Sequence, residues 1–438
     1  MVPLQNLFLL FGIKFVKEII TFLNIRMNAF LLCIIWMVSL TWCHLFAQPM
    51  KLGIDNLVET NFEILRNKNI GLLTNSACRT STLMPTPEAF LRSKNCTLTV
   101  LFTPEHGYYA GIPAGEYVAD DSLWNIPAFS LYGKNRRPTE AMLAHCDIVV
   151  ADIQDIGIRS YTFISTLLQV MDACAEYGKP LYVLDRPNPL GGILIDGNIP
   201  ETLSFVCALP VPYIHGCTIG ELATMANNEG WLGKNSDGKS RRCSLTVVKM
   251  KRWTRTMVWE KTGLPFIPTS PNIISPETIR CAAITGILGE LSVVSIGIGT
   301  AMPFRWCGMP DIAADTLLSA FAIKKNDSII AVSSAFYPQF GKFAKTRCYG
   351  ILFHCPPSHS VPYFSRGLDL CRALRTVNPS LFDKSTLQSS NKEMFSKVLG
   401  SKKLADALLS GDNITIKQLS SSGIDEYRRM REKYLLYK

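Results

Sequence analysis

Four short apolar runs in the first half of the chain each end at a cluster of polar residues. They cover residues 70–74, a run that ends at Thr103, residues 148–151 and residues 181–184. The polar clusters that follow them begin at Asn75, Pro104, Asp152 and Asp185. Continuous apolar runs of this length are typical of strands that are buried on both faces of a sheet.

Stretches with helical spacing lie between and after these runs. Leu167, Leu168, Met171 and Ala175 recur at helical intervals before a Gly-Lys-Pro stop. Thr218, followed three residues later by a glutamate, is typical of a capping box that opens a helix over residues 219–228. Strands that alternate with helices predict βαβ units and a parallel sheet.

The polar clusters place candidate catalytic groups at one edge of the predicted sheet, where ligands bind in open α/β folds. Glu105 is a candidate proton donor for glycosidic bond cleavage, a reaction that commonly uses two carboxyl groups. Asp152, Asp155 and Asp185 are candidate partners for it. Each of these carboxylates has a structural alternative, because aspartate after a strand often accepts backbone N–H bonds at the next helix.

Other polar residues of these clusters are candidates for binding a substrate. The planar guanidinium groups of Arg159 and Arg186 can pair with a carboxylate through two hydrogen bonds. That carboxylate belongs either to a substrate or to a neighbouring aspartate. Tyr161, Asn188 and His215 have groups that hydrogen bond to sugar hydroxyls or an acetamido group, or else to nearby backbone.

The order of the patterns predicts two domains, over residues 51–265 and 266–438. The first contains the strand and helix alternation, a strand over residues 245–248, and a long connection over residues 103–137, which at that length indicates function. A cluster of four prolines marks the boundary. Beyond it we expect strands over residues 291–298 and 328–332 and helices over residues 365–376 and 425–437.

The first 47 residues resemble a secretory leader. Arg26 precedes a short apolar run and small or neutral residues near a cleavage site, which predicts export to the periplasm or the outside. An uncleaved membrane anchor is the alternative, and a start at Met27 would explain the additional apolar stretch over residues 7–22. Most of the 14 cysteines are expected to be buried free thiols, because no Cys-X-X-Cys pair occurs and several lie in apolar segments.

The composition, 47% hydrophobic and 18% charged, is that of a globular protein with a large core. The net charge of +10 comes without a dense basic run or zinc-finger spacing, so no nucleic-acid partner is expected. No metal and no cofactor are expected either. The sequence has no P-loop and no G-X-S-X-G, and Gly297-Ile298-Gly299 lacks the third glycine of a dinucleotide fingerprint.

Several longer motifs, in the same order along the chain, resemble those of the NamZ-type family of exo-β-N-acetylmuramidases. The matching segments are Gly71-Leu72-Leu73-Thr74-Asn75, Thr103-Pro104-Glu105-His106-Gly107, Ser130-Leu131-Tyr132-Gly133-Lys134, Asp152-Ile153-Gln154-Asp155-Ile156-Gly157, Tyr161-Thr162, Leu184-Asp185-Arg186-Pro187-Asn188-Pro189 and Ser270-Pro271-Asn272-Ile273. The resemblance runs from about residue 52 to the end of the chain.

The resemblance implies an α/β fold, with a Rossmann-like parallel-sheet domain, a smaller α+β carboxy-terminal domain and a cleft between them. It implies release of N-acetylmuramic acid (MurNAc) from the non-reducing ends of peptidoglycan fragments, with Glu105 as the proposed catalytic glutamate. Asp152 and Asp185 remain its candidate catalytic partners. The expected substrate-binding residues are Asn75, His106, Gln154, Arg159, Tyr161, Arg186, Asn188, His215 and Asn272.

One segment departs from the family pattern. Ile296 and Ile298 stand where many members have a glutamate and an arginine. Isoleucines do not hydrogen bond to a sugar, so this side of the cleft is expected to accept a different aglycone or a differently decorated muramic acid. The alternatives are a muropeptide-binding protein without activity and an NAD-dependent Rossmann enzyme acting on a sugar. The expected partners are peptidoglycan-derived disaccharides or muropeptides, with no stable membrane partner beyond a possible uncleaved leader, and the oligomeric state stays open.

Overall fold

The computed structural model describes residues 17–19, 21–22, 49–322, 328–383 and 385–438. Most of the predicted leader therefore lies outside the described residues. Within those residues, no helix combines the length and apolarity that a membrane span requires. The segment from Met50 to Lys438 forms one compact unit.

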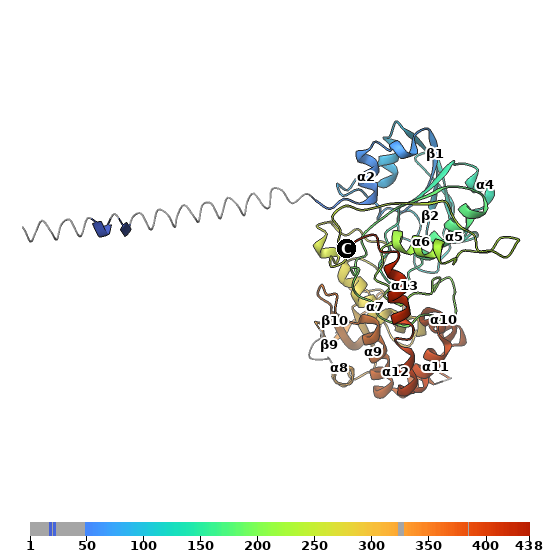
Figure 1. Ribbon diagram of the computed structural model, residues 1–438. Helices are drawn as coiled ribbons and strands as arrows, with labels where there is room; N and C mark the ends of the chain where they lie inside the picture. Colours follow the sequence, from blue (N-terminus) through green and yellow to red (C-terminus); the bar gives the residue numbers. More distant parts are fainter. Residues whose placement is uncertain (1–16, 20, 23–48, 323–327, 384) are drawn as a thin grey trace, which may run out of the picture. The chain divides into compact units, whose positions relative to one another are not determined.

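A seven-stranded sheet organises the first half of this unit (Figure 1). Its order is β3-β4-β2-β1-β5-β6-β7, and every neighbouring pair is parallel except β3 with β4. The strands are β1 (Lys68–Leu73), β2 (Cys96–Thr103), β3 (Asp121–Leu123), β4 (Ile126–Ser130), β5 (Ile148–Ala151), β6 (Leu181–Leu184) and β7 (Leu245–Val248). The helices of this half are α2 (Gly53–Glu59), α3 (Thr86–Leu91), α4 (Glu140–Leu143), α5 (Phe163–Glu176) and α6 (Ile219–Asn228).

Apolar residues on both faces of the central strands explain the continuous apolar runs. Leu72 belongs to the same buried cluster as Phe90 of α3, on one side of the sheet. The next residue, Leu73, belongs to the cluster that contains Leu167 of α5, on the other side. Successive strand residues point to opposite faces, and each buried leucine contributes roughly 1.5–3 kcal/mol. The sheet is therefore held between two helical layers.

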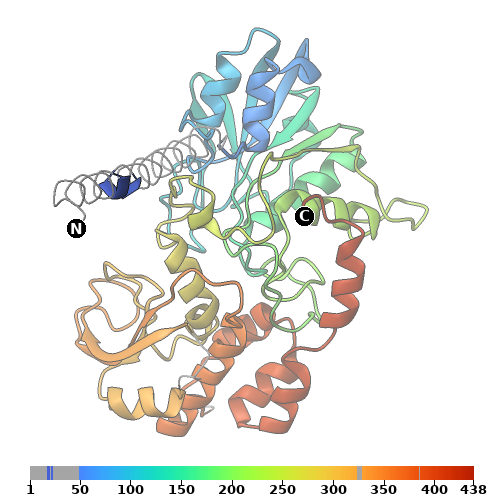
Figure 2. The ribbon, with the colours of Figure 1, turned by 60° about the vertical axis from the view of Figure 1, so that its left-hand side comes forward.

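The second half contains a three-stranded antiparallel sheet and seven helices among the described residues (Figure 2). The sheet order is β8-β10-β9. The elements are α7 (Pro276–Leu291), β8 (Trp306–Met309), α8 (Ala314–Phe321), β9 (Ile330–Phe336), β10 (Cys348–His354), α9 (Tyr363–Val377), α10 (Ser389–Leu399), α11 (Lys402–Ser410), α12 (Asn413–Leu419) and α13 (Ile424–Glu432).

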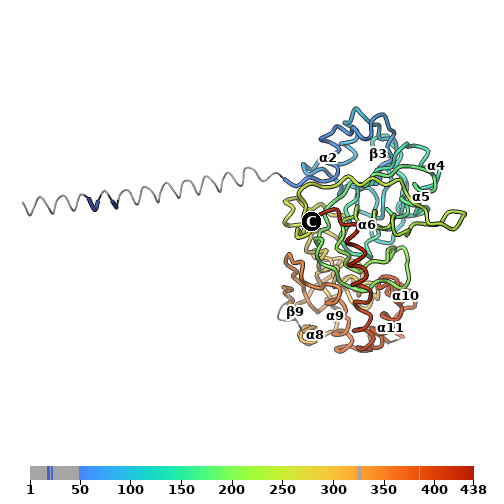
Figure 3. Tube along the Cα trace, in the orientation of Figure 1, coloured from blue at the N-terminus to red at the C-terminus, as the bar shows by residue number. Residues whose placement is uncertain are grey.

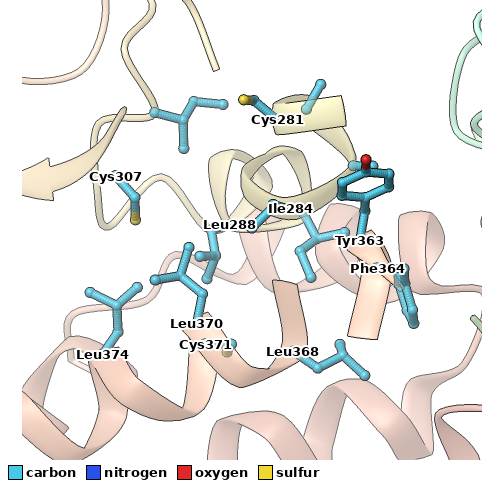
Figure 4. Packing of buried hydrophobic residues seen from close by; sticks show 14 of the residues in the cluster. Cys281, Ile284, Leu288, Cys307, Tyr363, Phe364, Leu368, Leu370, Cys371 and Leu374 are labelled. Atoms are coloured by element: carbon cyan, nitrogen blue, oxygen red, sulfur yellow. The ribbon is translucent and has the colours of Figure 1, made fainter. Parts of the chain in front are cut away.

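Helix α7 is buried along most of its length against α9. Its side chains Ile284 and Leu288 and the α9 side chains Leu370 and Leu374 belong to one apolar cluster (Figure 4). The two helices approach closely at Gly367, where an added Cβ would lie 2.5 Å from the carbonyl oxygen of Ile284. Only glycine allows this approach.

The end of the chain returns to the first sheet, and the trace in Figure 3 ends beside α6. The Tyr427 hydroxyl of α13 donates to the His215 carbonyl at 2.8 Å. Beyond α13, the Leu436 amide donates to Glu221 Oε1 at 2.9 Å, and the Tyr437 hydroxyl donates to Asp185 Oδ2 at 2.6 Å. The last residues therefore hold the end of β6 and the start of α6.

Most of the predicted elements are confirmed. The strands β1, β2, β5, β6 and β7 and the helices α5, α6 and α9 lie where the patterns place them. Strand β9 begins two residues later than predicted, and α13 ends at Glu432, five residues earlier than predicted. The described cysteines are all buried and free, as expected. The connection over residues 103–137 contains the β3 and β4 hairpin.

The prediction of a strand over residues 291–298 is wrong. The apolar run there begins as the last turn of α7, which ends at Leu291. Gly297 and Gly299 then adopt positive φ angles of 83° and 89°, which a strand does not accommodate. Apolar character alone does not separate a buried helix end from a buried strand.

Arg159 connects the two halves of the unit. Its guanidinium is buried and donates to four backbone carbonyls, which belong to Asn198 (2.6 Å), Val211 (2.8 Å), Val398 (3.2 Å) and Leu399 (2.9 Å). The last two lie at the carboxyl end of α10, where a cation also interacts favourably with the helix dipole. Burial lowers the pKa of Arg159.

We predict that replacing Arg159 with methionine lowers the free energy of unfolding by at least about 3 kcal/mol, because four carbonyls lose a charged donor. Urea denaturation measures this loss. The matched control is Arg66→Met, which removes an exposed arginine paired only with Glu63 and should change stability by no more than about 0.5 kcal/mol. A change below about 1 kcal/mol for Arg159→Met would contradict the structural role.

Candidate active site

The carboxyl ends of four parallel strands bring the predicted polar clusters to one edge of the sheet. Asn75 follows β1, Glu105 follows β2, Asp155 lies beyond β5 and Arg186 lies beyond β6. These strands are neighbours in the order β2-β1-β5-β6. The predicted clustering of these residues is therefore confirmed.

Glu105 is buried at this edge, with 6% of its surface exposed, and hydrogen-bond donors reach both carboxylate oxygens. The Gly115 amide donates to Oε1 at 3.0 Å, and the Thr162 hydroxyl donates to Oε2. The loop that delivers Gly115 turns at His106, whose φ of 73° is positive and whose Nδ1 lies 2.7 Å from the Ile112 carbonyl oxygen. His106 therefore shapes the loop around Glu105.

Two tyrosines lie close enough to Glu105 to respond to its charge. Burial raises the pKa of Tyr132 to about 12, and the Glu105 carboxylate adds to the rise. Burial also raises the pKa of Tyr161, with smaller contributions from Asp155 and Glu105. The Tyr161 hydroxyl donates to Thr269 Oγ1 at 2.9 Å, which brings the turn that contains Asn272 toward the site.

Asp152 does not fit its predicted catalytic role. Its carboxylate forms a bidentate pair with Arg186, with Oδ1 2.5 Å from Nε and Oδ2 2.8 Å from Nη2. The Thr86 hydroxyl donates to the same Oδ2, and Asp152 has no exposed surface. Arg186 also donates to the Arg79 carbonyl at 2.9 Å. The ion pair therefore anchors the ends of β5 and β6. Because its guanidinium is already paired, Arg186 does not fit the prediction that it binds a substrate carboxylate either.

Asp185 also has a structural role in place of the predicted catalytic one. It accepts hydrogen bonds from the Thr218 hydroxyl (2.8 Å), the Gly220 amide (2.8 Å) and the Tyr437 hydroxyl. Burial raises the pKa of Asp185 to about 6, although these hydrogen bonds oppose the rise. The carboxylate thus joins β6 to the start of α6, the alternative that the sequence left open.

Two further predicted ligands have backbone partners. Arg159 uses its guanidinium on the four carbonyls described above, so it does not fit the prediction that it binds a substrate carboxylate. Asn188 donates to the Cys217 carbonyl at 2.9 Å and accepts from the Leu190 amide at 2.9 Å. Both residues shape the loops that surround the site.

The remaining predicted ligands leave buried polar atoms unpaired. Among the described residues, no hydrogen-bond partner reaches Asn75 Nδ2, Gln154 Oε1, Asp155 Oδ1 or His215 Nε2. The Cys217 amide donates to His215 Nδ1 at 3.2 Å, and Asp155 Oδ2 lies 3.4 Å from His215 Nε2. An unpaired buried polar atom lowers the free energy of unfolding by roughly 1–3 kcal/mol. Several such atoms at one edge of the sheet therefore indicate a site for a ligand whose hydroxyl and amide groups would pair with them.

Sequence reasoning missed Thr162, Tyr132 and a second carboxyl group, Glu290. Glu290 lies in the last turn of α7 and is partly buried. Burial raises the pKa of Glu290 to about 7, and the charge of Glu105 adds to the rise. The only signal in the sequence is a single acid inside an apolar run.

A buried glutamate beside unpaired polar atoms, at the carboxyl edge of a parallel sheet, is suited to the cleavage of glycosidic bonds. The family description "Exo-beta-N-acetylmuramidase NamZ, N-terminal" matches residues 70–277, and its carboxy-terminal counterpart matches residues 283–437. The chain belongs to this NamZ family of glycosidases, so the predicted family, fold class and type of enzyme are confirmed.

The relatives agree with this assignment. The chain is 34% identical over 393 residues to the peptidoglycan β-N-acetylmuramidase NamZ of Bacillus subtilis (strain 168), covering 89% of this chain and 91% of the relative. Two crystal structures of DUF1343 family proteins from Bacteroides fragilis NCTC 9343 have the same fold. Their TM-scores are 0.81 and 0.67, their identities are 35% and 26%, and each comparison covers 89% of this chain and 99% of the other.

The raised pKa of Glu290 predicts how Glu290→Gln changes stability with pH. Between its ordinary value of 4.5 and about 7, the folded state keeps a proton that the unfolded state has lost, so Glu290 lowers stability as the pH rises. The titratable groups that interact electrostatically with Glu290 are Glu105 and Tyr213. We expect the variant to melt at least about 2 °C above the parent at pH 8 and at the same temperature at pH 4. Glu393→Gln, at an exposed site on α10, should give no such gain.

Proposed function

We propose that this protein is an exo-acting glycosidase that releases MurNAc from the non-reducing ends of peptidoglycan fragments, with Glu105 as general acid/base. The disaccharide of MurNAc and N-acetylglucosamine (MurNAc-GlcNAc) is its smallest substrate. It acts after export to the periplasm or the outside, directed by the leader at residues 1–47. Residues 51–265 form the catalytic domain, and residues 266–438 complete the cleft.

The observation that carries the proposal is the environment of Glu105. The loop after β2 and the Thr162 hydroxyl hold its carboxyl group in a fixed position at the strand edge. A fixed carboxyl group can exchange a proton with a glycosidic oxygen or a water without a reorganisation cost during the reaction. The unpaired atoms of Asn75, Gln154 and Asp155 supply one donor and two acceptors for hydroxyl and acetamido groups.

Arg136 is the arginine that we assign to the lactyl carboxylate of MurNAc. Its guanidinium lies 5.3 Å from the ring centroid of Tyr132 and 4.4 Å from that of Phe205. Tyr132 is the tyrosine beside Glu105. In the described part of the chain no carboxylate contacts Arg136, so its fork is available for bidentate pairing, unlike the forks of Arg159 and Arg186.

For Glu105→Gln we expect the release of MurNAc from MurNAc-GlcNAc to fall at least about a hundredfold in kcat, the usual scale for a lost acid/base group. Chromatography of the released sugar measures the rate. Glu116→Gln is the matched control, because Glu116 lies exposed in the same loop. A parent protein that binds the disaccharide without cutting it would favour the binding-protein alternative, and an active Glu105→Gln variant would reject Glu105 as the catalyst.

For Arg136→Ala we expect kcat/KM for MurNAc-GlcNAc to fall about tenfold, mainly through KM, because one charge-assisted contact is lost. The methyl ester of the lactyl group removes the substrate charge, so parent and variant should cleave that ester equally well. Lys134→Ala, two residues away and exposed, should leave both rates unchanged. An equal loss on acid and ester would show that Arg136 does not recognise the carboxylate.

A further inference from the structure

We propose that Glu290 is the second catalytic carboxyl group of this enzyme, and that it donates the proton to the departing glycosidic oxygen while Glu105 serves as the base. This inference rests on the proposed function. The two catalytic carboxyl groups then come from different halves of the chain. Glu105 follows strand β2 of the seven-stranded sheet, and Glu290 lies in the last turn of α7.

The position of Glu290 on α7 directs it toward the site. Gly286 lies one helical turn before it, and an added Cβ at Gly286 would be 3.9 Å from the Tyr213 hydroxyl oxygen. Residues four apart share a helix face, so Glu290 lies on the face that meets Tyr213. In agreement with this placement, burial raises the pKa of Tyr213 to about 12, and the charge of Glu290 contributes to the rise.

The short loop over residues 160–162 contacts both Tyr213 and Glu105. The Ser160 hydroxyl donates to the Tyr213 hydroxyl at 3.2 Å, and two residues later the Thr162 hydroxyl donates to Glu105. The loop over residues 160–162 therefore contacts both Glu105 and Tyr213, the residue that lies against the Gly286 face of α7. In agreement with this arrangement, burial raises the pKa of Glu290 and the charge of Glu105 adds to the rise.

No structural partner among the described residues explains the burial of Glu290. In the part of the chain that the structure describes, no cation and no hydrogen-bond donor contacts its carboxylate. Glu277, in the first turn of the same helix, instead pairs with Arg305 at 3.1 Å and accepts from the Cys355 amide at 3.1 Å. A partly buried acid without a partner lowers stability, and titratable groups of this kind gather at functional sites.

The different environments of Glu105 and Glu290 indicate which carboxyl group carries the proton. Donors from Gly115 and Thr162 stabilise a negative charge on Glu105. Burial, together with the negative charge of Glu105, raises the pKa of Glu290 to about 7, so a substantial fraction of Glu290 is protonated near neutral pH. Two carboxyl groups whose surroundings differ in this way are suited to opposite roles as acid and base.

The reaction moves one proton to the leaving oxygen and takes one proton from water. The proton of Glu290 moves to the glycosidic oxygen while the bond from that oxygen to the anomeric carbon breaks, and the bonding electrons leave with the alcohol. A water oxygen forms the new bond to the anomeric carbon, and Glu105 takes the proton that this water loses. Proton exchange with solvent then returns both carboxyl groups to their starting states.

The test compares two leaving groups on the full-length protein. Cleavage of MurNAc-GlcNAc requires a proton on the leaving sugar oxygen. Cleavage of 4-nitrophenyl β-N-acetylmuramide does not, because 4-nitrophenolate leaves readily as an anion. We expect Glu290→Gln to lose at least about a hundredfold in kcat on the disaccharide and less than about tenfold on the aryl glycoside. Glu105→Gln should lose activity on both substrates. The surface control Glu393→Gln should retain both activities.

The other outcomes separate the two proposals. An equal loss on both substrates would mean that Glu290 binds or positions the sugar, and no loss on either would mean that it takes no part; both results overturn the inference. Parent protein that releases MurNAc from neither substrate would overturn the proposed function itself. Glu290→Asp keeps a carboxyl group on a shorter side chain and should recover part of the disaccharide activity, which a folding defect would not explain.

Discussion

The structure depends on the buried guanidinium of Arg159. This one side chain collects carbonyls from the first half of the chain and from the end of α10, so it fixes the two halves against each other. The residues that follow it are Ser160, which contacts Tyr213, and Thr162, which contacts Glu105. An arginine is suited to this position because its five donors form a rigid fork that stays charged when buried. The same anchor that joins the halves thus sets the geometry of the site.

The acids at the strand ends divide into two groups by their partners. Asp152 and Asp185 each satisfy several donors and hold neighbouring strands and helices in register. Glu105 accepts hydrogen bonds at both oxygens from the Gly115 amide and the Thr162 hydroxyl, and it pairs with no cation among the described residues. Loss of one of these donors would leave a buried carboxylate without compensation, so the partners hold each acid in place. Because those acids secure the scaffold, Glu105 can be held in place for chemistry.

The sequence predicted the fold well because apolar runs and their polar ends are local signals. It placed β1, β2, β5 and β6, and the capping box correctly opened α6. It could not separate Asp152 from Glu105, since both follow buried strands and only long-range partners such as Arg186 distinguish them. It also could not find Glu290, because nothing local relates the end of α7 to a strand edge that precedes it by about 180 residues.

The two isoleucines that depart from the family pattern are best understood through α7. An added Cβ at Gly289 would be 2.5 Å from Cδ1 of Ile296, so Ile296 packs directly on the last turn of the helix, beside Glu290. Ile298 is partly buried against the same apolar cluster. A charged side chain at position 296 would place a polar group at the last turn of α7, whereas the isoleucine gives this turn an apolar neighbour. The departure therefore changes the surroundings of the residues at the end of α7, and it leaves the contacts of Glu105 with Gly115 and Thr162 intact.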